Sequence, residues 1–250
     1  MVTRQEIQAT CDDIVREFSP LQVVLFGSYA YGTPTEYSDV DLLVVMAIPE
    51  SETRRQEIDI RERIPERFKI HLLVRSPEEI AYRLSHNDWF LHEITEKGEV
   101  LYETPNFFLK PPKKEPCDMN PLTLEWVESA EEDYIGMQQL QQAQHPLYNI
   151  VCFDAQQCVE KYLKAWLQEQ NIPFPRTHDL QELLELVVPT MPMWRFWHPD
   201  FTLLSKHAVA TRYPGVSATA DNAEHAVHIS TEVRQAVREQ LKLPLDPSDT

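Results

Sequence analysis

Two short stretches near the start of the chain decide its fold: Val24-Leu25-Phe26-Gly27-Ser28-Tyr29-Ala30-Tyr31-Gly32 and Ser38-Asp39-Val40-Asp41-Leu42-Leu43-Val44-Val45. Each contains an apolar run of the kind that forms a buried strand. Gly27 follows the first run, where a residue without a side chain lets the backbone approach a ligand closely. Ser28 is placed to cap the turn that follows and to donate its hydroxyl to a phosphate.

The two aspartates of the second stretch are expected on one strand. Side chains alternate along a strand with a period of two, so Asp39 and Asp41 should project from the same face. Convergent carboxylate oxygens suit Mg²⁺ that bridges the phosphates of a nucleotide. The sequence therefore predicts a site for Mg²⁺ and for ATP or another nucleoside triphosphate, with Ser38 beside the phosphates.

Helical and strand patterns alternate through the first hundred residues, which predicts an α/β (α+β) domain with a small mixed sheet. Apolar and polar spacing predicts helices at 3–18 and 51–64 and a helical stretch at 76–97, and strands at 21–26, 37–47, 69–74 and 100–102. We expect this domain to span residues 1–103.

The amino-acid composition changes between residues 104 and 121, where prolines and lysines are typical of a semi-rigid linker. Beyond it, helical spacing predicts segments at 124–142, 149–170, 178–188 and 220–241, with an ambiguous aromatic stretch at 193–210. We expect an all-α up-and-down helical bundle over residues 122–242 and a loose tail over 243–250.

Composition narrows the class of function. The 250 residues carry a formal net charge of −17, and a protein that binds long nucleic acid usually needs a basic face. No uncharged apolar run is long enough to span a bilayer, and the first residues have no apolar signal core. The four cysteines have no metal-type spacing. We therefore expect a cytoplasmic protein that has no membrane partner and does not act on long nucleic acid.

Gly27-Ser28 followed by Ser38-Asp39-Val40-Asp41-Leu42 resembles the signature of the DNA polymerase beta-type nucleotidyltransferases, and most of all their minimal (MNT) branch. The second half resembles a HEPN domain. That similarity lies in Phe153-Asp154-Ala155-Gln156-Gln157-Cys158-Val159-Glu160-Lys161-Tyr162-Leu163-Lys164-Ala165, Thr177-His178-Asp179-Leu180 and Thr211-Arg212-Tyr213-Pro214. The order of the two domains is similar to that of kanamycin nucleotidyltransferase, in which a helical domain completes the site.

The resemblance implies three carboxylates, two that bind metal and a third that orients or deprotonates the attacking hydroxyl. At the third position the chain has His71, in His71-Leu72-Leu73-Val74-Arg75. Histidine is well suited to accept a proton near neutral pH, and it also ligates softer divalent ions. A further possibility is a site that binds nucleotide without turnover. Another acid, such as Asp59 or Glu66, is a further candidate for the missing role.

The resemblance to HEPN domains has its own implications. Many of them are ribonucleases with an arginine followed four to six residues later by a histidine, and Arg212 has no histidine in that range. Lys161, Arg212 and Tyr213 are candidate residues of a nucleotide cleft, although a solvated or structural role is the simpler reading. His178 is expected to cap the helix that follows it. The aromatic residues near 194–201 predict bundle core or the surface of a homodimer.

The prediction is an Mg²⁺-dependent nucleotidyltransferase that moves a nucleoside monophosphate from a nucleoside triphosphate to a hydroxyl of a small molecule or protein. Asp39, Asp41 and His71 are the candidate catalytic residues, and Gly27, Ser28 and Ser38 the candidate nucleotide-binding residues. The alternative is a regulatory, antitoxin-like MNT–HEPN module that binds nucleotide without turnover. A HEPN ribonuclease is a third hypothesis.

Overall fold

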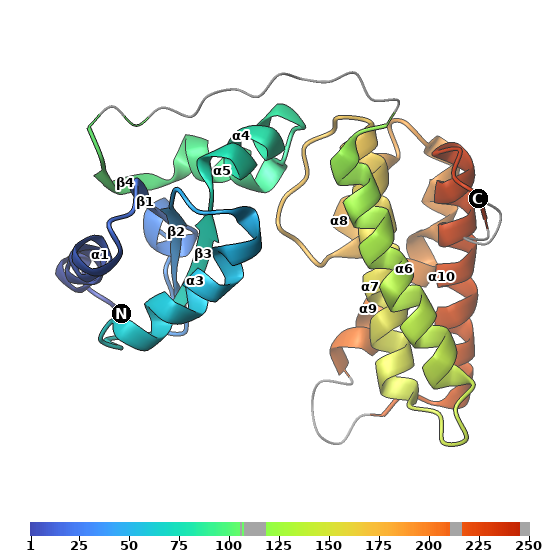
Figure 1. The fold of residues 1–250 in the computed structure, drawn as a ribbon. Helices are drawn as coiled ribbons and strands as arrows, with labels where there is room; N and C mark the ends of the chain where they lie inside the picture. The colour runs from blue at the N-terminus through green and yellow to red at the C-terminus, as the bar shows by residue number, and fades with distance from the viewer. Residues whose placement is uncertain (106, 108–118, 211–216, 246–250) are drawn as a thin grey trace. The chain divides into compact units, whose positions relative to one another are not determined.

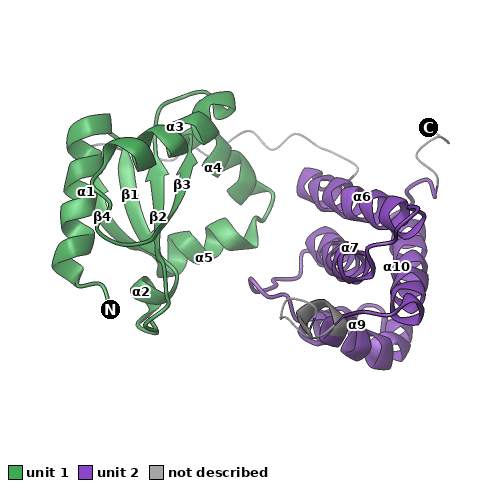
Figure 2. Cartoon of the chain, turned by 90° about the horizontal axis from the view of Figure 1, so that it is seen from below, with its two compact units in different colours: residues 1–115 green, residues 116–250 purple. Residues whose placement is uncertain are grey.

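The computed structural model describes residues 1–105, 107, 119–210 and 217–245, without the side chains of 207–210. The chain divides into two compact units, Met1–Glu115 and Pro116–Thr250 (Figures 1 and 2). Within the described residues, no helix is both long and apolar enough to cross a membrane.

The first unit contains a mixed four-stranded sheet with the order β3-β2-β1-β4. β1 (Gln22–Phe26) pairs antiparallel with β2 (Val40–Val45) and β4 (Glu99–Glu103), whereas β2 and β3 (Ile70–Arg75) are parallel. The parallel pair is joined by α3 (Glu50–Arg63), as a crossover connection requires. The predicted small mixed sheet is confirmed.

Helices pack on both faces of this sheet (Figure 2). On one face α1 (Arg4–Phe18) and α3 bury Ile7, Ile14 and Ile60 against the sheet. On the other, α4 (Pro77–Ser85) and α5 (Trp89–Lys97) bury Ile80, Leu91 and Ile94. Strand side chains alternate between the two cores, with Val40, Leu42 and Val44 facing the first and Leu43 and Val45 facing the second.

Two sequence expectations for this unit need correction. The helical stretch at 76–97 is two helices, because Asn87 adopts a left-handed φ of 60° and Asp88 then caps α5 through a bond to the Leu91 amide. The second strand is shorter than expected and begins at Val40, so Asp39 immediately precedes β2 rather than lying inside it.

Within the described residues of the second unit, every regular element is a helix. The unit contains α6 (Pro121–Gln141), α7 (Tyr148–Glu169), α8 (Leu180–Val187), the 3₁₀ helix η1 (Pro192–Trp197), α9 (His198–Ala210) and α10 (Ala220–Gln240). In Figure 1, α6, α7 and α10 run side by side along the bundle. The aromatic core expected near 194–201 is confirmed for Trp194, Trp197 and Phe201, which are buried, whereas Phe196 is exposed.

A largely buried ion-pair cluster joins three helices of the bundle. Arg234 of α10 donates two hydrogen bonds to the Glu131 carboxylate of α6, at 2.7 and 2.8 Å, and Tyr162 of α7 donates a third. Arg238 lies 3.5 Å from the same carboxylate. Burial alone would raise the pKa of Glu131, but the bonds from Arg234 and Tyr162 outweigh it and hold that pKa below its ordinary value.

The raised pKa of Asp154, in α7, predicts that the stability of the bundle depends on pH. Burial raises this pKa to about 6, and the charge of Asp133 contributes. The folded state therefore binds this proton more tightly than the unfolded chain, so stability falls as pH rises from about 4 through 6. Allowing for solvent screening, we expect Asp154→Asn to stabilise the bundle by about 1 kcal/mol at pH 8 and negligibly below pH 4.

Urea unfolding followed by tryptophan fluorescence checks this dependence, because Trp126, Trp166, Trp194 and Trp197 all lie in the second unit. The exposed Asp221→Asn serves as the control, with no gain expected between pH 5 and 8. A gain of the same size at pH 4 and pH 8 in Asp154→Asn would contradict the assignment.

Candidate functional site

The turn after β1 lies at the end of the sheet where β1 ends and β2 and β3 begin, and we call this end the edge of the sheet. Gly27 has φ 69° and ψ −156°, a conformation that essentially only glycine adopts. Its carbonyl accepts hydrogen bonds from the amides of Ala30 and Tyr31, both at 3.0 Å, which begin the short helix α2 (Ser28–Tyr31). The expectation that Ser28 caps this turn is wrong: Gly27 is the N-cap and no side chain caps α2.

Asp41 lies directly over this glycine. In the antiparallel register, Asp41 of β2 is opposite Phe26 of β1. A Cβ atom built on Gly27 would come within 2.9 Å of the Asp41 Cγ and would overlap the carboxylate itself. The space above Gly27 therefore holds the Asp41 side chain, and a larger residue at position 27 cannot share it.

His71 is the second partner of Asp41. The two residues are in register across the parallel β2–β3 pair, and His71 Nδ1 lies 2.9 Å from Asp41 Oδ1. The Phe26 ring meets the His71 ring edge to face, with centroids 6.3 Å apart, and also meets Phe90 of α5 at 5.6 Å. Asp41 and His71 thus lie on the face of the sheet that carries α4 and α5, and the Phe26 ring packs against His71 there.

Asp39 lies two residues earlier at the same edge. Its Oδ1 is 3.7 Å from Lys69 Nζ, so the Asp39–Lys69 pair repeats the Asp41–His71 pair one step along the two strands. The Ser38 hydroxyl accepts a hydrogen bond from the Thr35 amide at 2.9 Å, and the Ser38 amide donates to the Thr35 carbonyl. These bonds fix the loop that delivers Asp39.

The donor set fits Mg²⁺ only in company with phosphate. Within the described residues, no three histidine, cysteine, aspartate or glutamate side chains gather in a group able to hold a metal ion. Mg²⁺ is commonly held by one or two carboxylates with the remaining positions filled by substrate phosphates and water. Asp39 and Asp41, beside the Gly27 turn, match that pattern better than a metal cage made of protein alone.

A pocket of about 560 Å³ adjoins this edge. The segment 36–39 forms part of its wall, and the first residues of the chain, Glu6 of α1, Tyr29 of α2 and the segment 67–69 form the rest. Its volume is in the range of small-molecule sites. Asp39 is a lining residue of this pocket, whereas Asp41, His71 and Gly27 are not among its lining residues.

Two residues of the edge were missed from the sequence. Lys69 precedes His71 by two positions, the same spacing that separates Asp39 from Asp41. Because side chains alternate along a strand, this spacing already indicated that Lys69 lies on the same face as His71. Tyr31 ends α2; burial raises the pKa of its phenol, and the charges of Glu93 and Asp41 act in the same direction. Neither residue belongs to a motif that draws attention by itself.

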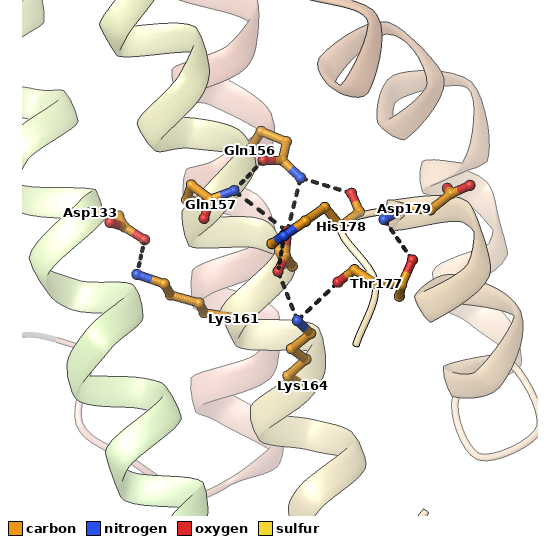
Figure 3. Close-up of polar contacts among 9 residues, drawn as sticks. Asp133, Gln156, Gln157, Lys161, Lys164, Thr177, His178 and Asp179 are labelled. Atoms are coloured by element: carbon orange, nitrogen blue, oxygen red, sulfur yellow. Dashed lines mark hydrogen bonds and ion pairs between the residues drawn. The ribbon is translucent and has the colours of Figure 1, made fainter. Parts of the chain in front are cut away.

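The candidate cleft residues of the second unit are placed differently. Lys161 Nζ lies 2.7 Å from Asp133 Oδ2 and donates to the Ser129 carbonyl, so its ammonium is bound to α6 (Figure 3). Arg212 and Tyr213 lie outside the described residues. The pairing of Lys161 supports a structural role within the bundle.

The sequence suggested that His178 caps α8, and this expectation is wrong. Asp179 is the N-cap, accepting from the amides of Gln181 and Glu182. His178 instead reaches back to the buried Glu160 of α7, with its Nδ1 3.1 Å from both carboxylate oxygens (Figure 3). This contact, together with a bond from Lys164 Nζ to the Thr177 carbonyl at 3.0 Å, fastens the loop before α8 to α7.

Comparison with known proteins assigns both halves of the chain. A nucleotidyltransferase domain model matches residues 9–100, and a HEPN domain model matches residues 123–240. A comparison with curated proteins gives no match. Solved structures similar to the chain include an archaeal HEPN homologue, 27% identical, which covers 47% of this chain and 96% of its own with a TM-score of 0.39.

Spectinomycin adenyltransferase AAD(9) from Enterococcus faecialis, solved with ATP and spectinomycin, is 12% identical. It matches 93% of this chain and 100% of its own length with a TM-score of 0.45. The two family models together account for the sheet unit and the helical unit described above. The chain therefore consists of a nucleotidyltransferase domain followed by a HEPN domain.

Proposed function

We propose that the protein is an Mg²⁺-dependent nucleotidyltransferase that moves a nucleoside monophosphate from ATP or another nucleoside triphosphate to a hydroxyl group. One observation carries the proposal: the Asp41 carboxylate lies over Gly27 and against His71, with Asp39 two residues away at the same sheet edge. The nucleotidyltransferase domain match over residues 9–100 includes all four of these residues.

Each residue of the edge has a separate role in this proposal. Asp39 and Asp41 hold Mg²⁺, which supplies positive charge to the phosphates when it is bound. Gly27 leaves room for the Asp41 carboxylate over the turn, and its backbone is the proposed contact with the triphosphate. The Ser28 hydroxyl makes no hydrogen bond within the part of the chain that the structure describes, so it is available to a phosphate oxygen. Ser38 keeps its loop, and with it Asp39, in position.

The reaction is an in-line displacement at the α-phosphorus. A bond forms between the acceptor oxygen and the α-phosphorus, and the bond to pyrophosphate breaks, with pyrophosphate leaving. The acceptor proton goes to His71. Because Asp41 accepts a hydrogen bond from His71 Nδ1, the other ring nitrogen, Nε2, is left to take that proton. The acceptor is a hydroxyl of a small molecule or of a protein.

Incorporation of label tests the proposal. Wild-type protein is incubated with a nucleoside triphosphate labelled at the α-phosphate, with and without Mg²⁺, and the released pyrophosphate is measured beside the labelled product. We expect metal-dependent release in the wild type and background release in Asp39→Ala and Asp41→Ala. Equal release by the wild type and both variants would remove the enzymatic function.

Nucleotide binding without turnover, as in a regulatory module, is the second candidate. It is favoured by His71, at the position where the resemblance to nucleotidyltransferases implies a third carboxylate, and by the two-carboxylate donor set of the edge. Calorimetry that detects Mg²⁺–ATP binding to the wild type, with no pyrophosphate after prolonged incubation, would favour this candidate over the transferase.

A further inference from the structure

Lys69 is the outermost of two basic side chains that face the candidate metal carboxylates. Asp41 and His71 are in register across β2 and β3, and Asp39 and Lys69 stand one period-two step before them. The main chain is anchored at this step, because the Val40 amide donates to the Lys69 carbonyl at 3.1 Å. The Lys69 ammonium is therefore tethered close to Asp39 by the register of the sheet.

The Lys69 side chain itself is loosely held. It is 85% exposed, and its ammonium lies 3.7 Å from Asp39, a distance at which an exposed pair contributes little. Arg67 lines the same pocket but is engaged elsewhere, because it donates to the partly buried Asp13 at 2.6 Å. Of the two basic side chains that line the pocket, Lys69 is the one able to move.

Nucleotide binding creates a need for such a cation. A triphosphate brings several negative charges to an edge that already has two carboxylates, and one divalent ion does not neutralise them all. An ion held by Asp39 would compete with Lys69 for that carboxylate, and the ammonium would then lose its partner. Lysine binds phosphate as a mobile point charge, so a triphosphate bound at this edge would offer the ammonium a new partner.

We propose that Lys69 is a phosphate-binding residue that pairs with Asp39 while the site lacks nucleotide and moves to the triphosphate when Mg²⁺ takes that carboxylate. The inference rests on the proposed function, because it needs a metal-bound nucleotide at Asp39 and Asp41. It assigns to Lys69 opposite effects on the two ligands: Lys69 competes with the metal alone and assists the nucleotide.

Lys69→Gln separates these two effects by binding measurements that need no turnover. Mn²⁺ serves as a paramagnetic substitute for Mg²⁺, and its binding to the full-length protein is measured by electron paramagnetic resonance. We expect Lys69→Gln to tighten Mn²⁺ binding in the absence of nucleotide two- to fivefold, because a competing charge is removed. We expect it to weaken binding of α,β-methylene-ATP with Mg²⁺ about tenfold in calorimetry, because a charged phosphate contact is lost.

Two variants control the experiment. Lys69→Arg keeps the charge and should bind both ligands within about twofold of the wild type. Arg63→Gln removes an exposed cation that pairs with Glu17 at 3.1 Å, away from the edge, and should change neither affinity.

The outcomes distinguish this inference from the proposed function. If Lys69→Gln leaves both affinities unchanged, or weakens both equally, the role of Lys69 is overturned while wild-type nucleotide binding keeps the function intact. The proposed function and the inference fail together in two cases. In the first, the wild type binds no nucleotide. In the second, Asp39→Ala and Asp41→Ala bind nucleotide as tightly as the wild type does.

Discussion

Replacing Gly27 with alanine is expected to destabilise the first unit by about 3 kcal/mol and to abolish metal-dependent nucleotide binding. Two costs add at this position. The φ and ψ of Gly27 lie in a region that side chains avoid, which costs about 1–3 kcal/mol. The new Cβ also overlaps the Asp41 carboxylate, so the carboxylate must leave its place beside His71.

Gly32→Ala is the matched control for this change. Gly32 ends α2 with φ 78° and ψ 18°, an ordinary left-handed conformation, and a Cβ there meets nothing within 4 Å. We expect a loss of about 1 kcal/mol and unchanged nucleotide affinity. Hydrogen exchange of peptides from β1 and β2 gives the stability of the first unit, and calorimetry gives the affinity. Equal losses in the two variants would show that Asp41 is not confined by Gly27.

Replacing Glu131 with leucine is expected to destabilise the helical unit by about 3 kcal/mol. The Glu131 carboxylate is the shared partner of Arg234 and Arg238, whose side chains are 11% and 7% exposed. Removing one partner of a buried ion pair leaves the opposite charge without compensation, which typically costs about 3–5 kcal/mol. Tyr162 loses the acceptor of its hydroxyl in the same change.

Urea unfolding followed by tryptophan fluorescence measures this loss. Glu132→Gln, at the exposed neighbouring position of α6, should change the free energy of unfolding by less than about 0.5 kcal/mol. Glu131→Leu combined with Arg234→Met should recover part of the loss, because one uncompensated charge is then removed. A Glu131→Leu protein as stable as the Glu132→Gln protein would show that the cluster contributes nothing.

Much of the fold was predictable because its signals are local. The capping box of Thr3 and Glu6 begins α1 as its pattern indicates, and the apolar runs of β1 and β3 give strands within one or two residues of the expected bounds. The break between α4 and α5 was missed because it depends on a left-handed asparagine inside a continuous helical pattern. Single residues of this kind leave periodicity almost unchanged.

The candidate site was predictable in its members but not in its contacts. The sequence indicated Gly27, Asp39, Asp41 and His71, and all four lie at one sheet edge. That His71 contacts Asp41, and that Lys69 faces Asp39, follows from the parallel register of β2 and β3, which strand propensity does not specify. The roles of these residues, the domain bounds and the homodimer remain predictions.

Apolar and basic side chains alternate along the start of β3, so the register of this strand decides both its packing and its contacts with the aspartates. Ile70 and Leu72 point into one hydrophobic layer, while Lys69 and His71 point to the opposite side with the aspartates. A slip of one residue would move Leu72 to the face that carries the aspartates and turn the imidazole toward the apolar layer of Ile7 and Ile60, so a misaligned strand loses its contacts with both aspartates. A molecule that pairs β2 and β3 out of register therefore lacks the Asp39–Lys69 and Asp41–His71 contacts and, with them, the candidate site.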